Sequence, residues 1–290
     1  MIHPTTSRWR GSAPVVAGLA GLLALPCLAA DTDTDTVDPA AEAFSYQIGL
    51  ATAWKPSYAG SDSYDVSARP VLGLRWGRFR LTSSQANLIE GPSDGSRAPG
   101  ASISLVESSR WSSGLALRYD NGRSPSDDPR LAALPEVRST LRARLYGRYA
   151  LDSQPGDQRA LGAALSGDLL DRDGGVTLSV DLSRRVALSP TLRWTQGVGL
   201  SAADATYMRS HHGVPAESAA AAGLPAYQPG AGLTDVHVGT GLTWRLAPNW
   251  RVGGSVAYTY LLGPAADSPL TVRRGSVGLV LGVVYLSDAD

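Results

Sequence analysis

The chain has 290 residues, a formal net charge of zero at pH 7 and 43% hydrophobic residues. This length fits one large β-domain or two small domains. The balanced charge argues against nucleic-acid binding, which requires a basic excess. After residue 30 no segment is apolar for 18 residues, which excludes a helical membrane protein but not a β-barrel, whose strands alternate apolar and polar residues.

Residues 1–30 have the pattern of a targeting segment. Arg8 and Arg10 supply a positive start, and Ala13 to Leu25 is an apolar run without charge. Ala29-Ala30 supplies the small residues that signal peptidase prefers. We therefore predict a cleavable secretory signal peptide, because the apolar run is shorter than the roughly 20 residues of a membrane helix.

Cys27 is the only cysteine of the chain. It raises the alternative of a lipoprotein signal, which Pro26 directly before it fits poorly. If Cys27 leaves with the signal, the mature chain has no thiol, and disulfides and thiolate metal sites are both excluded.

Residues 31–43 alternate Asp and Thr and then run through Asp38-Pro39-Ala40-Ala41-Glu42. We predict a short, disordered, acidic linker in the periplasm. We assign residues 44–290 to the folded domain.

A spacing of two dominates this domain. From Tyr46 to Trp54 the even positions are mostly apolar or aromatic, and the odd positions are small or polar. Residues 66–76 repeat the pattern, and residues 137–149 show it most clearly. Further runs of this kind lie near 79–81, 111–119, 161–169, 176–182, 192–200, 236–244, 250–260 and 277–285. A helix would not sustain this spacing, so we predict about twelve strands of roughly 9–13 residues.

The connections between these runs alternate in length. The long ones lie near 55–64, 89–99, 120–136, 203–232 and 263–273, and most others are short. Two break the rule, because 150–158 is long and 170–174 is short. With aromatic residues near strand ends, this predicts an all-β, antiparallel, up-and-down transmembrane β-barrel whose long loops are extracellular. A secreted β-sandwich is the alternative fold, since its strands also alternate.

Several loop motifs follow one another in a recognisable order. They include Pro56, Tyr58, Gly60, Ser61 and Asp62; Tyr119 to Arg123; Gly223, Leu224, Pro225 and Tyr227; and Asp267, Ser268 and Pro269. Together they resemble the MipA/OmpV family of MltA-interacting proteins over residues 44–286. The resemblance implies a protein of the outer membrane, in contact with outer-membrane lipid. The family's namesake is a scaffold that links a murein lytic transglycosylase to a penicillin-binding protein.

The chain departs from the family pattern at two places. His212 stands where an aromatic residue usually precedes Gly213-Val214. The chain ends in Asp288-Ala289-Asp290, whereas family members end in a phenylalanine that the barrel-assembly machinery recognises. Without this aromatic residue, the sequence leaves open whether the barrel is inserted efficiently into the membrane.

Two groups of histidines suggest chemistry. His211 and His212 could bind a metal ion, but no third ligand lies close by, and exposed loop polarity is the favoured interpretation. His237 suggests a lipid hydrolase, yet the spacing to a serine is missing and the residue should face the lumen. We therefore expect no catalytic residue, no metal and no cofactor, and we interpret the Tyr58 to Asp62 motif as turn chemistry.

Seven arginines fall on the polar face of the predicted strands. They are Arg138, Arg142, Arg144, Arg148, Arg69, Arg75 and Arg193. Inside a barrel they must meet acids or water, because buried unpaired charge is unfavourable. Candidate acids are Asp65, Asp181, Asp62, Asp127 and Asp128. A charge-paired plug favours a scaffold for cell-wall machinery, and a hydrated interior favours the alternative, a small channel for polar or anionic solutes.

Overall fold

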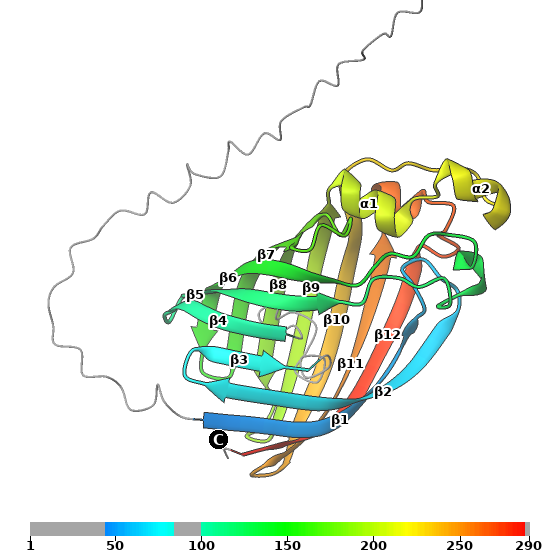
Figure 1. The fold of residues 1–290 in the computed structure, drawn as a ribbon. Coiled ribbons are helices and arrows are strands. Elements are labelled where there is room, and N and C mark those ends of the chain that lie inside the picture. Colours follow the sequence, from blue (N-terminus) through cyan, green and yellow to red (C-terminus); the bar gives the residue numbers. More distant parts are fainter. Residues whose placement is uncertain (1–43, 84–99, 288–290) are drawn as a thin grey trace, which may run out of the picture. The chain divides into compact units, whose positions relative to one another are not determined.

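The computed structural model describes residues 44–83 and 100–287 of the chain. The predicted signal peptide, the acidic linker, the connection near 89–99 and Asp288-Ala289-Asp290 lie outside the described residues. In the described part, antiparallel strands form a closed barrel in which each strand pairs with its neighbours in the chain and β1 pairs with β12 (Figure 1).

The described residues form twelve strands, as predicted. They are β1 (Phe44–Pro56), β2 (Tyr64–Trp76), β3 (Phe79–Thr82), β4 (Gly100–Glu107), β5 (Trp111–Asp120), β6 (Thr140–Gln154), β7 (Asp157–Asp168), β8 (Val176–Ala187), β9 (Leu192–Ala203), β10 (Gly232–Ala247), β11 (Trp250–Leu261) and β12 (Gly275–Leu286). The prediction of an up-and-down barrel is confirmed, and the sandwich alternative is wrong because the sheet closes on itself.

The seam between β1 and β12 joins the first and last strands. Its ladder runs from Gln47 opposite Leu286 to Trp54 opposite Leu279. Beyond the ladder, the Tyr46 N–H donates to Ser287 Oγ at 2.9 Å, and the Ser287 N–H donates to the Tyr46 carbonyl at 2.9 Å. Along this ladder, neither the first nor the last strand therefore leaves its edge open to lipid.

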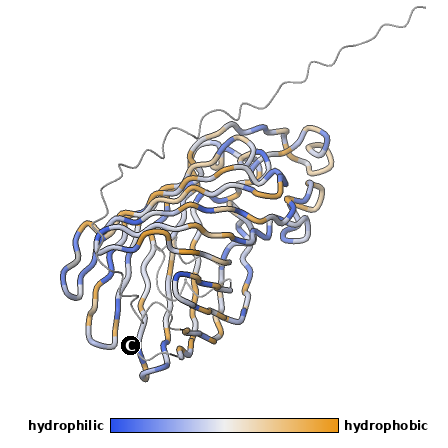
Figure 2. The backbone as a smooth tube through the Cα atoms, turned by 60° about the vertical axis from the view of Figure 1, so that its left-hand side comes forward, coloured by the Kyte–Doolittle hydropathy of each residue, from blue (hydrophilic) through white to orange (hydrophobic). Residues whose placement is uncertain are grey.

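The two faces of the wall follow the sequence alternation. On β6, Leu145 is 51% exposed on the outer face, whereas Tyr146, the next residue, is only 9% exposed and points inward. Figure 2 shows the same alternation of hydrophobic and hydrophilic residues along the strands. Because the apolar phase faces outward, the wall suits a hydrocarbon environment.

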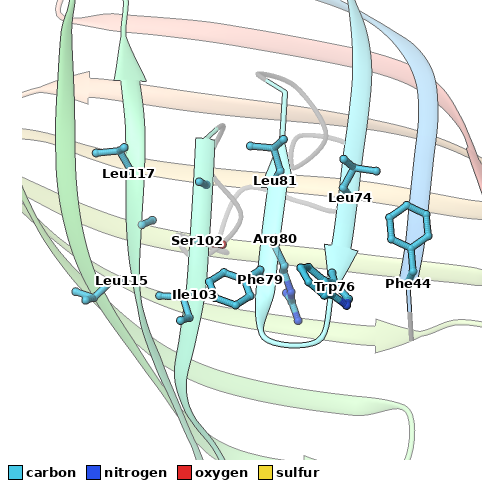
Figure 3. A pocket seen from close by; sticks show the side chains of 12 residues that line it. Phe44, Leu74, Trp76, Phe79, Arg80, Leu81, Ser102, Ile103, Leu115 and Leu117 are labelled. Carbon is cyan, nitrogen blue, oxygen red and sulfur yellow. The ribbon is translucent and has the colours of Figure 1, made fainter. Parts of the chain in front are cut away.

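Aromatic side chains gather where the short turns lie, which we name the turn end; the opposite end is the loop end. Trp76, Phe79 and Phe44 line one hollow of about 550 Å³ on the outer face of the wall, next to the β2–β3 turn (Figure 3). Trp111 and Tyr149 pack with ring centroids 4.7 Å apart on β5 and β6. Such rings favour the boundary between lipid and water.

The interior is partly filled by side chains. Ala51, Ala53, Val71, Val280 and Val284 form a buried apolar cluster beside the seam. A second cluster joins Ala116, Tyr146 and Ala164. The interior therefore contains apolar packing as well as arginines.

One of the predicted connections is wrong. The connection near 150–158 is not long, because β6 extends to Gln154 and β7 begins at Asp157. Only Pro155-Gly156 remain as the turn, and Gly156 has the positive φ of +82° that such a turn requires. An irregularity between Ala150 and Asp152 breaks the alternation and hides this end of the strand from the pattern. The connection after β7 is short, as predicted.

Short helices lie in the loop-end connections. They are the 3₁₀-helix Pro129–Leu131, α1 (Ala205–His212), α2 (Ala216–Ala222) and α3 (Gly263–Ala266). No helix within the described ranges is both long and apolar enough to cross a membrane.

The alternation predicts that a charged residue destabilises the barrel more on the outer face of β8 than on its inner face. Val180 points outward and is 40% exposed, and its neighbour Ser179 points inward. We expect Val180→Arg to lower the free energy of unfolding by about 2–4 kcal/mol, because arginine is unfavourable in the hydrocarbon region. Ser179→Arg should have a smaller effect. Unfolding of both variants in lipid vesicles by urea measures the difference, and equal losses would contradict the assignment of faces.

Candidate functional site at the loop end

Five connections at the loop end are hydrogen-bonded to one another, and we name this assembly the loop cap. It comprises residues 57–63, 121–139, 169–175, 204–231 and 262–274. Side chains of one connection repeatedly bond to the backbone of the next, so that the connections hold each other in place.

An apolar cluster lies at the centre of the loop cap. It contains Tyr58, Leu131, Leu134, Val214 and Leu270, which come from four different connections. The Tyr58 hydroxyl donates to the Leu270 carbonyl at 2.9 Å. Burial raises the pKa of Tyr58, so the hydroxyl remains a donor at neutral pH.

The first loop motif has a structural explanation. Ser61 is 1% exposed and donates to Asp128 Oδ2 at 3.1 Å. Gly60 has a φ of +98°, and its carbonyl accepts from the Val272 and Arg273 N–H groups at 2.8 and 3.0 Å. A Cβ on Gly60 would approach Thr271 Oγ1 to 2.8 Å. Glycine is therefore required both by its φ and by the close approach of the neighbouring loop.

The adjacent histidines lie on a helix, not in an exposed loop. Helix α1 begins after Asp204, whose side chain accepts from the Tyr207 N–H at 2.8 Å. His212 is 3% exposed, and His211 is half-buried with its ring stacked on Tyr207 at 4.2 Å. The exposed-loop interpretation of His211 and His212 is wrong, because the capped helix turns both rings toward protein.

Both histidine carbonyls anchor the loop cap. Arg123 Nη1 donates to the His211 carbonyl at 2.8 Å, and Ser268 Oγ donates to the His212 carbonyl at 2.6 Å. Burial lowers the pKa of each ring to about 4. Arg123 contributes to both low pKa values, Arg142 to that of His211 and His211 to that of His212, whereas Asp120 acts oppositely on His211 and Asp235 on His212. Both rings are therefore neutral at pH 7.

Arg142 joins the loop cap to the barrel wall from inside. Its Nη1 donates to the Gly174 carbonyl at 2.6 Å, and its Nη2 donates to the Ser166 carbonyl at 3.1 Å. Asp120 lies 3.9 Å away, and the guanidinium carbon is 5.6 Å from the Tyr207 ring centre. The side chain is 7% exposed, so this charge is held by carbonyls and one carboxylate.

The other predicted lumen arginines are not brought together with Arg142. Arg69, Arg75 and Arg193 are exposed on inward-facing positions of β2 and β9, and Arg144 and Arg148 are half-buried on β6. Arg138 is exposed and precedes the first residue of β6, so its assignment to the inward row of that strand is wrong.

Of the candidate acids, Asp128 folds inward, but it accepts from Ser61 and from the Arg130 N–H. Asp62, Asp65 and Asp127 are exposed, and Asp181 is half-buried beside Gly162. Asp120, at the end of β5, forms the ion pair with Arg142.

Arg123 is a buried residue that strand patterns could not indicate. It is 7% exposed and lies in a connection, where it forms an isolated β-bridge with Val137. The resemblance of Tyr119 to Arg123 to a family motif was the only sequence signal that included it.

The remaining motif residues have local or packing roles. Gly223 ends α2 with a φ of +64°, and Leu224 packs against the apolar cluster. The Tyr227 hydroxyl donates to the Pro264 carbonyl at 2.9 Å, and Asp267 forms an ion pair with Arg274 at 3.1 Å. Pro56 ends β1, Pro225 is exposed, and Pro269 is half-buried beside Ser268.

His237 lies on the inner face of β10. Its Nδ1 is 2.9 Å from Asp235 Oδ1, and its ring lies against Gly199. Ser201 hydrogen-bonds to Asp235 and not to the imidazole, so the three side chains do not have the nucleophile–base order of a hydrolase. Among the residues that the structure describes, no group of three His, Cys, Asp or Glu could hold a metal ion.

A polar hollow of about 150 Å³ lies at the turn end, beside the β4–β5 turn. Its lining includes Arg110, Arg148, Arg159, Ser108, Ser112 and Gln158. Arginine and serine donors around a small recess suit a carboxylate or a phosphate. This hollow is the second candidate site.

The loop cap predicts a specific effect of Tyr58→Phe. The change keeps the ring in the apolar cluster and removes the donor to the buried Leu270 carbonyl. We expect the cap to lose about 1–3 kcal/mol of stability against local opening. Faster hydrogen exchange of the Val272 and Arg273 amides, which bond to Gly60, would report it. Tyr119→Phe on the exposed outer face is the control and should leave exchange unchanged.

The buried histidines predict that acid loosens the loop cap. Each folded-state pKa of about 4 lies below the ordinary value of 6.5, so the open cap binds protons first as the pH falls. The stabilisation is complete above about pH 6.5 and is lost toward pH 4. The rate of hydrogen exchange in residues 204–231, corrected for the intrinsic rate, should rise as the pH falls from about 6.5 to 4.

A double variant, His211→Gln/His212→Gln, should show a flatter pH profile, and His237→Gln serves as the control. Equal protection at pH 7 and pH 4.5 in the unaltered protein would contradict the role of these rings.

Comparison with solved structures finds several outer-membrane barrels. An outer-membrane channel from Pseudomonas putida F1 has a TM-score of 0.46 and 11% identity, covering 86% of this chain and 99% of that one. The KdgM porin has a TM-score of 0.41 and 12% identity, covering 82% and 98%. OmpT of Vibrio cholerae has a TM-score of 0.39 and 7% identity, covering 84% and 97%. A search of the curated proteins found no match.

Comparison with protein families gives a match that spans most of the chain. The family described as MltA-interacting protein MipA matches residues 48–286. The match begins within β1 and ends with β12, so it includes the barrel wall and every connection between these strands. The chain therefore belongs to the MipA family, and it is a β-barrel protein of the outer membrane.

Proposed function

We propose that this protein is a non-catalytic scaffold of the outer membrane whose turn end, facing the periplasm, binds a murein lytic transglycosylase. The observation that carries the proposal is the loop cap, in which five connections are bonded to one another. Mutual packing at the extracellular end argues against a freely open channel. It leaves the periplasmic end as the surface for partners.

The family description supports the type of partner. MipA is described as an MltA-interacting protein, and the family resemblance implies that this partner is a murein lytic transglycosylase. A bifunctional penicillin-binding protein is the second partner that the family resemblance implies. In this proposal the barrel itself performs no chemistry and brings the partners together at the inner surface of the membrane.

The polar hollow at the turn end is the contact that we propose for the transglycosylase. Arg110 and Arg148 line it together with serine hydroxyls. An acidic side chain of a partner would fit these donors, because arginine binds carboxylates in a forked geometry. Such an arginine can contribute strongly to an interface when it is shielded from water.

A binding experiment tests this contact. The barrel in lipid nanodiscs should bind a purified MltA-type transglycosylase, and Arg110→Gln/Arg148→Gln should weaken the affinity at least tenfold, about 1.4 kcal/mol. Arg273→Gln/Arg274→Gln removes the same charge at the loop end and should leave the Kd unchanged. No binding by the unaltered barrel above that of an unrelated barrel would contradict the scaffold proposal.

A small channel for anionic solutes is the second candidate function. It is favoured by Arg69, Arg75 and Arg193, which face inward and are exposed, so water reaches the interior beside them. Conductance across a planar bilayer separates the two functions. The scaffold proposal expects no sizeable steps, whereas anion-selective currents that Arg69→Gln/Arg75→Gln reduces would support the channel.

A further inference from the structure

The outer wall carries a groove that neither the loop cap nor the turn-end hollow explains. It has a volume of about 670 Å³ and crosses β7 to β11. Its apolar lining includes Leu182, Trp194, Val198, Val238, Val256 and Tyr258. These side chains point outward, since Leu182 and Val198 are 46% and 44% exposed, whereas Ser183, which points inward, is 7% exposed.

A row of polar side chains crosses this outward face. Arg159 pairs with Arg184, Arg184 with Gln196, and Gln196 with Thr240 across successive strands. Directly paired residues project from the same face of a sheet, so the four side chains form one contiguous row. Cationic and amide groups are unfavourable in hydrocarbon, and a row of them on a lipid-facing wall needs a polar ligand or the lipid–water boundary.

The groove rises from the turn end toward the loop end. Arg184 lies three residues before Ala187, where β8 ends at the turn end. Tyr258 lies three residues before Leu261, where β11 ends at the loop end. The two arginines of the row therefore lie at the level of the periplasmic boundary, and Thr240 and the apolar part of the groove lie further into the bilayer.

The charges at the lower end of the groove are balanced. Asp157 accepts from Arg184 Nε at 2.9 Å and Nη2 at 2.6 Å, and it lies 3.9 Å from Arg159 Nη2. Asp152 pairs with Arg159 on the next strand. The Arg159 and Arg184 side chains are 52% and 45% exposed. Two guanidinium groups flanked by two carboxylates match a head group that has both a phosphate and an ammonium.

Trp194 and Thr240 fix the wall of the groove. The indole Nε1–H donates to Thr240 Oγ1 at 2.7 Å, which satisfies both polar groups beside lipid. The Gln196 side chain lies between Arg184 and Thr240 in the register.

We propose that this groove is a binding site for one zwitterionic glycerophospholipid of the periplasmic leaflet. Its phosphate contacts Arg159 and Arg184, and its primary ammonium contacts Asp152 and Asp157. One acyl chain lies along the apolar part of the groove. Arg159 also lines the turn-end hollow, but Arg110→Gln/Arg148→Gln leaves Arg159 and Arg184 unchanged, so the scaffold function could fail without affecting this inference.

The test uses vesicles that contain equal amounts of phosphatidylethanolamine and phosphatidylglycerol. The full-length mature barrel is extracted in mild detergent, and retained lipid is counted by native mass spectrometry. We expect one retained phosphatidylethanolamine for each barrel, and at least a tenfold loss in Arg159→Gln/Arg184→Gln. Arg69→Gln/Arg75→Gln changes two arginines of the inner face and should retain the lipid.

A second variant tests the apolar part of the groove. Val198→Trp should fill it and displace the acyl chain while both arginines remain, with folding checked by the shift in electrophoretic mobility on heating. Retention equal to the unaltered protein in Arg159→Gln/Arg184→Gln or in Val198→Trp would overturn the site. Equal retention of phosphatidylglycerol, or retention of lipid A in its place, would overturn the assignment of the zwitterionic lipid.

Discussion

The hydrogen-bond ladder between β1 and β12 is the constraint on which the rest of the structure depends. Within a bilayer no water can satisfy backbone N–H and C=O groups, so a sheet can span it only when its first and last strands pair. Here the ladder runs along most of both strands and continues into the bonds between Tyr46 and Ser287. Once the sheet is closed, each strand has one lipid face and one inner face, and the alternation in the sequence follows from this geometry.

Closure also determines where function can be placed. The wall faces lipid and side chains partly fill the interior, so surfaces for recognition remain at the two ends and in irregular parts of the outer face. At the loop end the connections pack on each other, and Arg142 ties them to the wall through backbone carbonyls. At the turn end short turns leave polar side chains around a small hollow. The two ends therefore have different characters, one packed and one accessible.

The sequence predicted about twelve strands, the faces of most of them and the outer-membrane fold, because these depend on a local period of two. It could not predict the contacts of the loop cap, since Tyr58 and Leu270 are 212 positions apart. His211 and His212 appeared to be exposed because the helix that holds them was not anticipated. Asp204 followed by Ala-Thr-Tyr was an available N-cap signal. The row from Arg159 to Thr240 depends on the register of four strands, which no single strand reveals.

The bonds between Tyr46 and Ser287 have a consequence for the order of the chain. They hold the beginning of β1 and the end of β12 within hydrogen-bonding distance at the turn end. A short peptide could join these two points, and the two-residue turn at Pro155-Gly156 could be opened in exchange. The wall would keep every strand pair, and only the covalent link between β6 and β7 would be lost. Its architecture is therefore cyclic, and the native termini mark only one of several turns at which such a ring can be cut.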